Sequence, residues 1–311
     1  MVNFNGNIQE NSGITIDNNR GFLFGDSVFE TIRVVDGKIL FAEEHYFRLM
    51  ASMRICRMEI PMEFTLEYFE SEILKLMQKL AASSAYRARF SVFRKGDGFY
   101  LPKTNEVDFL ITAQSLESRM YQFDENETYE VEIYKDAHIT KQLFSTLKTN
   151  NKMIYVAGSI FASENGYDNC LLVNDEKNIV EALQSNVFML MGDQLITPPV
   201  ADGCLNGIMR KNVIKVVAKI ADIQMVEKSI SPFDLQKADE IFLTNVITGI
   251  QSVAKYRKKT FKNDLAKKVL AQLNATANLG NTNINDAASS DIQSTAVVSS
   301  MLPAHQRLLL E

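Results

Sequence analysis

The sequence predicts an α+β fold in two domains, and three patterns carry this prediction. Residues 28–41 read as two short β-branched strands joined by an Asp-Gly turn, which is a strong hairpin signal. Apolar residues recur three and four positions apart over 43–55 and 66–80, which indicates two helices. The polar stretch 116–128 has neither pattern and predicts a linker between the two domains.

The strands that complete the first domain follow the two helices. Residues 86–95 alternate, with Arg87 and Arg89 on one face and apolar side chains on the other, as in a strand with one polar side. A further apolar strand begins at Val107. We therefore expect a small N-terminal α+β domain over residues 1–115.

The second domain begins with a strand near Val131 and continues into a helix. Apolar spacing predicts this helix, and Asn150 and Gly166 are suited to begin and end it. Two lysines, Lys148 and Lys152, therefore lie at the entrance to a helix.

The rest of the second domain, which spans 129–274, predicts a mostly antiparallel sheet or barrel with helices. Two pairs of apolar strands are each joined by a polar turn, one of them Gly192-Asp193. An amphipathic helix follows Asn206-Gly207, and Ser231-Pro232 opens a short helix. In residues 275–311 Ala, Ser, Thr and Asn dominate, so we expect a low-complexity, disordered tail.

The composition argues against several kinds of partner. A net charge of −5 without a basic block gives no electrostatic site for nucleic acid or an anionic membrane. The three cysteines and three histidines lack the spacings of disulfide frameworks and metal sites. The polar start of the chain is no signal peptide, and no apolar run has the length of a membrane span. We expect a cytoplasmic protein without a metal ion.

Lys148 is the first candidate for chemistry. A loop lysine is usually a solvated surface residue. Lys148 is instead flanked by small polar residues at a helix entrance, as expected of an amine that forms a Schiff base and later moves protons. Such an amine needs a lowered pKa, which burial or a nearby cation such as Lys152 can supply.

Two further features lie about thirty and sixty residues beyond Lys148. Glu181 stands in an apolar strand, where a carboxylate is costly unless it meets a cation or a donor. Gly207 precedes a helix, whose first N–H groups can hold a phosphate. Taken singly, a salt bridge and an ordinary capped helix explain them. Together with Lys148 they are the amine, the carboxylate and the phosphate site that a pyridoxal phosphate enzyme needs.

Several motifs in one order resemble those of the class IV aminotransferases, which are pyridoxal phosphate enzymes of fold type IV. This family includes branched-chain and D-amino-acid aminotransferases and aminodeoxychorismate lyase. The resemblance implies a small N-terminal α/β sandwich, a larger β-barrel-like C-terminal domain with helices, and a homodimer. It covers residues 2 to about 273, and its motifs are RGFLFGDSVFETIRV, EEHYFRLMASM, LKTNN, EALQSNVF, GCLNGIMR and DEIFLTNVITGI.

The resemblance also implies roles for individual residues. Lys148 would form the Schiff base with the cofactor, and Thr31 would assist at the leaving group. Arg48 would bind the cofactor phosphate and Glu181 the pyridine nitrogen. The other residues implied to bind the cofactor are Asn186, Gly207, Ile208, Met209, Thr244 and Asn245. The residues implied to bind the substrate are Lys152, Arg94, Arg89, Tyr100 and Phe29, with Arg94 the best candidate for the substrate carboxylate.

Within the family, two motifs resemble the lyases more than the aminotransferases. Gly207-Ile208-Met209 lacks the threonine usual in aminotransferases, and Asn245-Val246-Ile247 replaces their Gly-Thr-Ala. Lys152 stands where lyases often have arginine, although the rest of TNNKMIYV departs from the usual lyase segment. The leading expectation is therefore aminodeoxychorismate lyase, which forms 4-aminobenzoate and pyruvate. The alternatives are an amino acid aminotransferase and, from another class, a non-catalytic binding protein on the same scaffold.

Overall fold

The computed structural model describes residues 1–123 and 128–279. Met1–Leu273 forms one compact unit. In the described part of the chain, no helix combines the length and the apolar character needed to cross a membrane.

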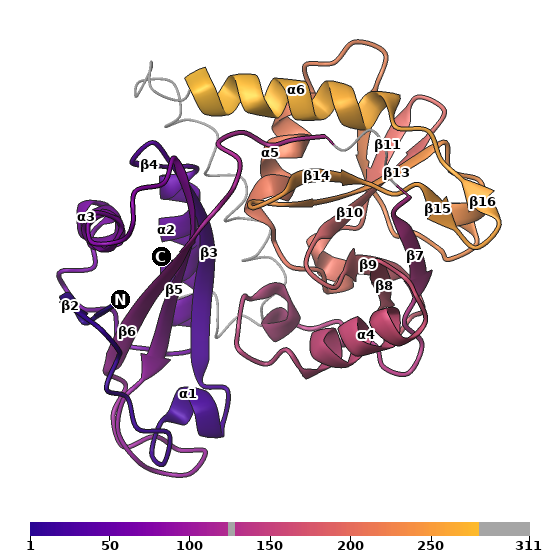
Figure 1. The fold of residues 1–311 in the computed structure, drawn as a ribbon. Helices are drawn as coiled ribbons and strands as arrows, with labels where there is room; N and C mark the ends of the chain where they lie inside the picture. Colours follow the sequence, from indigo (N-terminus) through magenta and orange to yellow (C-terminus); the bar gives the residue numbers. More distant parts are fainter. Residues whose placement is uncertain (124–127, 280–311) are drawn as a thin grey trace. The chain divides into compact units, whose positions relative to one another are not determined.

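The N-terminal part of this unit contains a six-stranded antiparallel sheet, which Figure 1 shows in indigo to purple. Its strands are β1 (Val2–Phe4), β2 (Asn7–Gln9), β3 (Ser27–Val35), β4 (Lys38–Ile39), β5 (Ala85–Arg94) and β6 (Val107–Ser115). They lie in the order β2-β1-β6-β5-β3-β4. The expected hairpin between β3 and β4 is confirmed, because Asp36 and Gly37 have φ angles of 48° and 72° that reverse the chain.

Helices α2 (Ala42–Ile55) and α3 (Leu66–Met77) confirm the two predicted helices and pack on this sheet. Ile32 of β3 and Phe90 of β5 meet Leu49 of α2 and Leu76 of α3 in one apolar core. The side chains that alternate with Ile32 along β3 are buried as well, including Phe29. Side chains on both faces of β3 are therefore buried. Helices α2 and α3 pack against one of these faces, the one that carries Ile32.

The C-terminal part contains two five-stranded sheets, with the orders β12-β11-β10-β13-β14 and β16-β15-β7-β8-β9. Five of the eight strand pairs in these sheets are antiparallel, as the sequence predicts. The first sheet is formed by β10 (Asn186–Met191), β11 (Gln194–Thr197), β12 (Gln224–Glu227), β13 (Glu240–Asn245) and β14 (Gly249–Ser252). The second is formed by β7 (Glu130–Ile133), β8 (Asn169–Val173), β9 (Ile179–Ala182), β15 (Lys255–Tyr256) and β16 (Lys259–Thr260).

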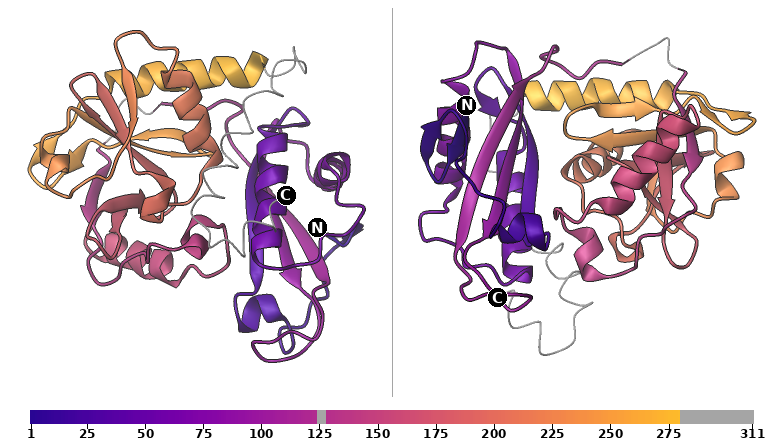
Figure 2. Two further views of the ribbon diagram at one scale, coloured as in Figure 1. Left: turned by 180° about the vertical axis from the view of Figure 1, so that it is seen from behind. Right: turned by 60° about the horizontal axis from the view of Figure 1, so that its bottom comes forward.

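Helices cover these two sheets. Figure 2 shows α5 (Ile208–Val217) and α6 (Asp264–Leu279), which share one apolar core with Phe188 of β10 and Phe242 of β13. Leu172 of β8 and Val180 of β9 share another core with residues of α4 (Met153–Glu164). The remaining helical segments of the described residues are α1 (Arg20–Leu23) and three 3₁₀ turns at Leu143–Thr146, Val200–Asp202 and Asp234–Gln236.

The expected linker contains no helix or strand over residues 116–123, and residues 124–127 lie outside the described part. Arg33 of β3 fastens this stretch, because its guanidinium donates to the carbonyls of Ser118, Met120 and Ile247. The proposed division into two domains at 115 and 129 stays a prediction, since residues 1–273 form one compact unit.

Two expectations about helix ends differ from the structure. Lys152 rather than Asn150 occupies the N-cap position of α4, and its side chain makes no capping bond. The amide oxygen of Asn150 instead accepts a hydrogen bond from Arg89 at 2.7 Å. Helix α6 continues to Leu279, past the expected start of the tail at 275, and the rest of that tail lies outside the described residues.

Candidate active site

The backbone beside β3 places Lys148. The N–H of Phe29 donates to the Lys148 carbonyl at 2.8 Å, and the N–H of Asn150 donates to the Ser27 carbonyl at 3.1 Å. This short antiparallel bridge holds residues 148–150 in extended form, so alternate side chains point to opposite sides. The Lys148 amine consequently lies 4.7 Å from the centre of the Phe29 ring.

The surroundings of Lys148 favour its neutral form. Burial and the positive charge of Arg48 are the largest causes, and together with Lys152 and Arg89 they lower its pKa from 10.5 to about 7. The Glu30 carboxylate opposes this shift. Lys148 is therefore an amine that is half deprotonated near neutral pH, as a nucleophilic lysine requires.

Arg48 is fixed by a buried cluster between α2 and β3. Its Nε and Nη2 atoms donate to the Glu30 carboxylate at 2.7 and 2.5 Å, and Nδ1 of His45 lies 2.7 Å from the same carboxylate. Burial alone would raise the pKa of Glu30, but the Arg48 charge and the bonds from His45 and Arg48 lower it to about 2. Nη1 of Arg48 reaches the carbonyl of Asn206 at 3.0 Å, which brings this cation to the start of α5.

The loop before α5 has the features of an anion site. No side chain caps α5 at Gly207, so the first N–H groups of the helix, including those of Ile208 and Met209, have no capping partner. A Cβ atom at Gly207 would collide with Oδ1 of Asn186, so a larger residue would require the Asn186 side chain to move. The amide nitrogen of Asn186 donates to the Leu205 carbonyl at 2.9 Å and so holds this loop in place.

Glu181 lies on β9 with only 3% of its surface exposed. Its Oε1 atom accepts from the Tyr155 hydroxyl at 2.5 Å, and its Oε2 atom accepts from the Leu205 N–H at 2.9 Å. Burial raises the pKa of Glu181, while both hydrogen bonds and the charges of Lys152 and Lys148 oppose that shift. The sequence alone does not point to Tyr155, because a tyrosine in the first turn of a helix has no local pattern that indicates a partner distant in the chain.

Thr244 and Asn245 build the turn that follows β13. The Thr244 hydroxyl donates to the Gly249 carbonyl at 2.7 Å, and Oδ1 of Asn245 accepts from the N–H groups of Ile247 and Thr248 at 2.9 Å each. The Asn245 amide nitrogen donates in addition to the Ser185 hydroxyl at 3.0 Å, which ties the turn to the segment before β10. The expected contact of Thr244 and Asn245 with a cofactor stays a prediction.

Arg89, Phe29 and Thr31 lie together on the side of the N-terminal sheet that faces Lys148. The guanidinium carbon of Arg89 lies 3.6 Å from the centre of the Phe29 ring, and Thr31 is opposite Arg89 in the β3–β5 register. The Arg89 side chain donates to Ser91 and Asn150 and makes no ion pair within the described residues. It is a cation available to a ligand.

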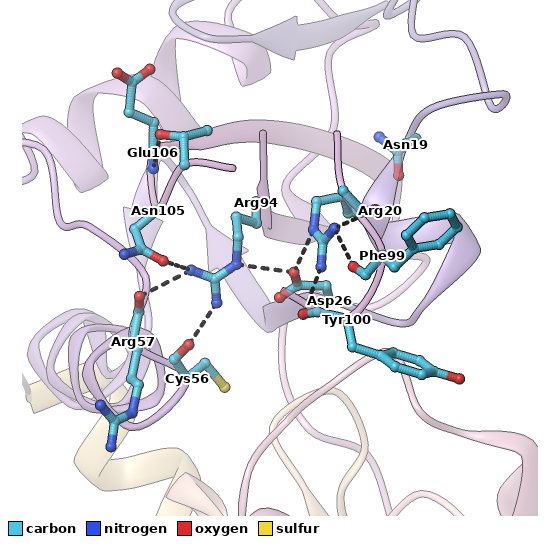
Figure 3. A network of polar contacts seen from close by, with 12 residues as sticks. Asn19, Arg20, Asp26, Cys56, Arg57, Arg94, Phe99, Tyr100, Asn105 and Glu106 are labelled. Carbon is cyan, nitrogen blue, oxygen red and sulfur yellow. Dashed lines mark hydrogen bonds and ion pairs between the residues drawn. The ribbon is translucent and has the colours of Figure 1, made fainter. Parts of the chain in front are cut away.

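Arg94 and Tyr100 occupy a different network, shown in Figure 3. Nε of Arg94 donates to Asp26 at 3.0 Å, while its Nη atoms donate to the carbonyls of Arg57 and Cys56 and to Asn105. The structure therefore weighs against Arg94 as the substrate-carboxylate residue, because four bonds within the chain already use its guanidinium.

Tyr100 is 90% exposed and lies against Phe24 with ring centres 5.8 Å apart. It shares a cleft of about 660 Å³ with Arg94, Lys152 and Tyr155. This cleft connects the Arg94 network to the residues around Glu181, although no contact in the described chain joins Tyr100 to Lys148.

The residues around Lys148 fit pyridoxal phosphate in three respects. Lys148 supplies a neutral amine, and the uncapped start of α5 with Arg48 supplies donors for a phosphate. Glu181 supplies a buried carboxylate for the ring nitrogen. The loop Leu205–Gly207 contacts Glu181, Asn186 and Arg48 and thus ties these groups to one place. Within residues 1–123 and 128–279, no three His, Cys, Asp or Glu side chains are grouped to hold a metal ion.

Comparison with known proteins agrees with this fit. The family model described as amino-transferase class IV matches residues 27–256. A D-alanine aminotransferase of Listeria monocytogenes is 28% identical over 255 residues, which cover 80% of this chain and 85% of the relative.

Solved structures show the same fold. The branched-chain amino acid aminotransferase of Thermobaculum terrenum, solved in its PLP-form, has a TM-score of 0.79 and 22% identity over 89% of this chain and 93% of its own. A Legionella pneumophila protein provisionally titled a 4-amino-4-deoxychorismate lyase has a TM-score of 0.72 and 26% identity, covering 83% of this chain and 94% of its own. The chain described here belongs to the class IV aminotransferase family and is a pyridoxal phosphate-dependent enzyme.

Proposed function

We propose that this enzyme is an aminodeoxychorismate lyase, which converts 4-amino-4-deoxychorismate to 4-aminobenzoate and pyruvate for folate biosynthesis. The observation that carries the proposal is the pair of cations Arg89 and Lys152 near Lys148. Neither has an ion-pair partner in the part of the chain that the structure describes. The proposed substrate carries two carboxylates, so two such cations match its charge.

Each charged residue then has a defined task. Lys148 would bind the cofactor covalently, Arg48 and the N–H groups after Gly207 would hold the phosphate, and Glu181 would face the ring nitrogen. When bound, pyridoxal phosphate supplies an imine to the substrate amine and withdraws electrons from the adjacent carbon. Arg89 and Lys152 would hold the two substrate carboxylates while this occurs.

The elimination itself needs one base and one acid. The neutral amine of Lys148 takes the proton from the amine-bearing ring carbon, which is possible near pH 7 because its pKa is about 7. The bond from the neighbouring ring carbon to the enolpyruvyl oxygen then breaks, and the ring becomes aromatic. The released enolpyruvate gains a proton and becomes pyruvate. We assign the buried hydroxyl of Thr31 to assist the leaving oxygen.

An amino acid aminotransferase is the second candidate. The Listeria D-alanine enzyme and the Thermobaculum branched-chain enzyme support it. Two cations also match a dicarboxylic amino acid such as glutamate, and Lys148 would remove the same kind of proton. The resemblance of Gly207-Ile208-Met209 and Asn245-Val246-Ile247 to lyase motifs favours the lyase.

We also propose a cytoplasmic homodimer. All three cysteines are unpaired, as expected in a reducing compartment. Met153, Val156 and Ile160 form one stripe of α4 and are 78%, 52% and 54% exposed. An exposed apolar stripe of this kind is typical of a surface that a second copy covers.

Light scattering on the purified protein tests the dimer. We expect twice the mass of the 35.1 kDa chain at micromolar concentration. We expect Val156→Lys, which places a charge in the α4 stripe, to shift the mass toward that of one chain. The mass of a single chain for the unaltered protein would contradict the homodimer.

The lyase proposal is tested by incubating the enzyme with aminodeoxychorismate and measuring pyruvate through a coupled dehydrogenase. We expect stoichiometric pyruvate and 4-aminobenzoate, without any added keto acid. A parallel panel of L- and D-amino acids should give no amino-group transfer to 2-oxoglutarate. Transfer of amino groups without pyruvate release would show an aminotransferase instead of a lyase. If cofactor-loaded protein catalysed neither reaction, a non-catalytic binding role would be favoured.

Arg89 and Arg94 form a matched pair of substitutions. Arg89→Met should raise KM at least tenfold and cost less stability than Arg94→Met, because Arg89 bonds only neutral side chains within the described chain and its proposed ionic partner is the substrate. Arg94→Met should instead lower the free energy of unfolding by about 3 kcal/mol, since it breaks a buried charge network. Urea unfolding and steady-state kinetics on both variants check this. If the Arg94→Met protein were as stable as the unaltered protein and had a raised KM, Arg94 would be assigned to substrate binding.

A further inference from the structure

Tyr155, on the first turn of α4, contacts two residues of the proposed site at once. Its hydroxyl donates to Oε1 of Glu181 at 2.5 Å. Its ring lies under the ammonium of Lys152, with 4.3 Å between Nζ and the ring centre. One side chain thus joins the residue proposed for the cofactor ring to a residue proposed for the substrate.

Glu181 depends on this hydroxyl for half of its hydrogen bonding. Its two carboxylate oxygens have one donor each in the described structure, Tyr155 at Oε1 and the Leu205 N–H at Oε2. The carboxylate is 3% exposed, so solvent cannot replace a lost donor readily. Without the Tyr155 hydroxyl, the Leu205 N–H would be the one remaining donor to the carboxylate in the described structure, so its orientation would be less restricted and its negative charge less stabilised.

Lys152 depends on the Tyr155 ring in a different way. Its side chain caps nothing at the start of α4 and forms no ion pair in the residues described. The Glu181 carboxylate attracts its ammonium group. The face of the Tyr155 ring, 4.3 Å from Nζ, attracts the same group and therefore helps to select its position.

We propose that Tyr155 is a positioning residue that orients the Glu181 carboxylate through its hydroxyl and the Lys152 ammonium through its ring. The proposal deepens the function given above and rests on the roles assigned there to Glu181 and Lys152. It differs from a packing role in the core beside Ile154 and Phe161, for which the hydroxyl would be dispensable.

Two substitutions distinguish the role of the Tyr155 hydroxyl from that of its ring. Tyr155→Phe removes the hydroxyl and keeps the ring, whereas Tyr155→Leu removes both. Tyr86→Phe is the matched control, because it removes a tyrosine hydroxyl that donates to the Ala81 carbonyl at 2.5 Å on the N-terminal sheet. Titration of pyridoxal phosphate into each cofactor-free protein gives the dissociation constant, and steady-state kinetics give kcat and KM.

We expect Tyr155→Phe to weaken pyridoxal phosphate binding about tenfold and to lower kcat with little change in KM, as loss of one hydrogen bond to a charged group predicts. Tyr155→Leu should show the same losses and a KM raised about fivefold, because Lys152 is then released. Tyr86→Phe should match the unaltered protein in all three quantities.

The outcomes also separate this inference from the lyase proposal. If Tyr155→Phe binds the cofactor as tightly as the unaltered protein and keeps its kcat, the hydroxyl positions nothing and the proposal fails. An unchanged KM in Tyr155→Leu would show that the Tyr155 ring does not position Lys152. If the enzyme transfers amino groups but releases no pyruvate, the lyase proposal fails, while the cofactor titration still decides the role of the Tyr155 hydroxyl.

Discussion

The balance of charge around one amine is the constraint on which the rest of the site depends. Lys148 is surrounded by the cations Arg48, Lys152 and Arg89, and the carboxylates of Glu30 and Glu181 offset them only in part. Burial and these cations lower its pKa to about 7, so a large fraction of the amine is neutral near pH 7 and can act as a nucleophile and a base. The same excess of positive charge suits an anionic cofactor and an anionic substrate. One electrostatic arrangement therefore serves binding and chemistry together.

Arg48 and Lys148 are held in place by partners within the chain. Glu30 neutralises Arg48 within a buried cluster, and this cluster joins α2, β3 and the loop before α5. The bridge between β3 and residues 148–150 fixes the backbone of Lys148 by two hydrogen bonds. The N-terminal sheet and the C-terminal sheets thus contribute to one site through short-range contacts within the compact unit. Because β3 has contacts on both sides, the side chains on both of its faces are buried.

The sequence predicts those parts of the site that depend on local pattern. Gly207 is the N-cap of α5, as its pattern predicts. Lys148 precedes α4 as predicted, but it lies four residues before the N-cap Lys152, in the extended bridge to β3. Partners distant in sequence could not be predicted in this way. Arg94 sits on the predicted strand, yet its bonds to the Arg57 and Cys56 carbonyls emerge only from the folded chain.

Asn150 shows the same limit. Asparagine is a favoured helix cap, but the backbone N–H of Asn150 donates to Ser27 of β3 and its side-chain oxygen accepts a hydrogen bond from Arg89. A tertiary contact here overrides a local preference. Tyr155 is the converse case, because its importance comes wholly from Glu181, twenty-six residues along the chain. The residues that orient a site are generally harder to find than those that carry its charge.

The most direct test of this account is the pH dependence of Lys148 reactivity in the cofactor-free protein. Only the neutral amine reacts with an acylating reagent, so the rate at Lys148, followed by mass spectrometry, reports its protonation. Lys103, which is 72% exposed, serves as the internal reference for the reagent. We predict that the rate at Lys148 rises with a midpoint near pH 7. A midpoint near 10.5 would show that burial and the neighbouring cations do not make Lys148 a neutral amine, and would contradict the account.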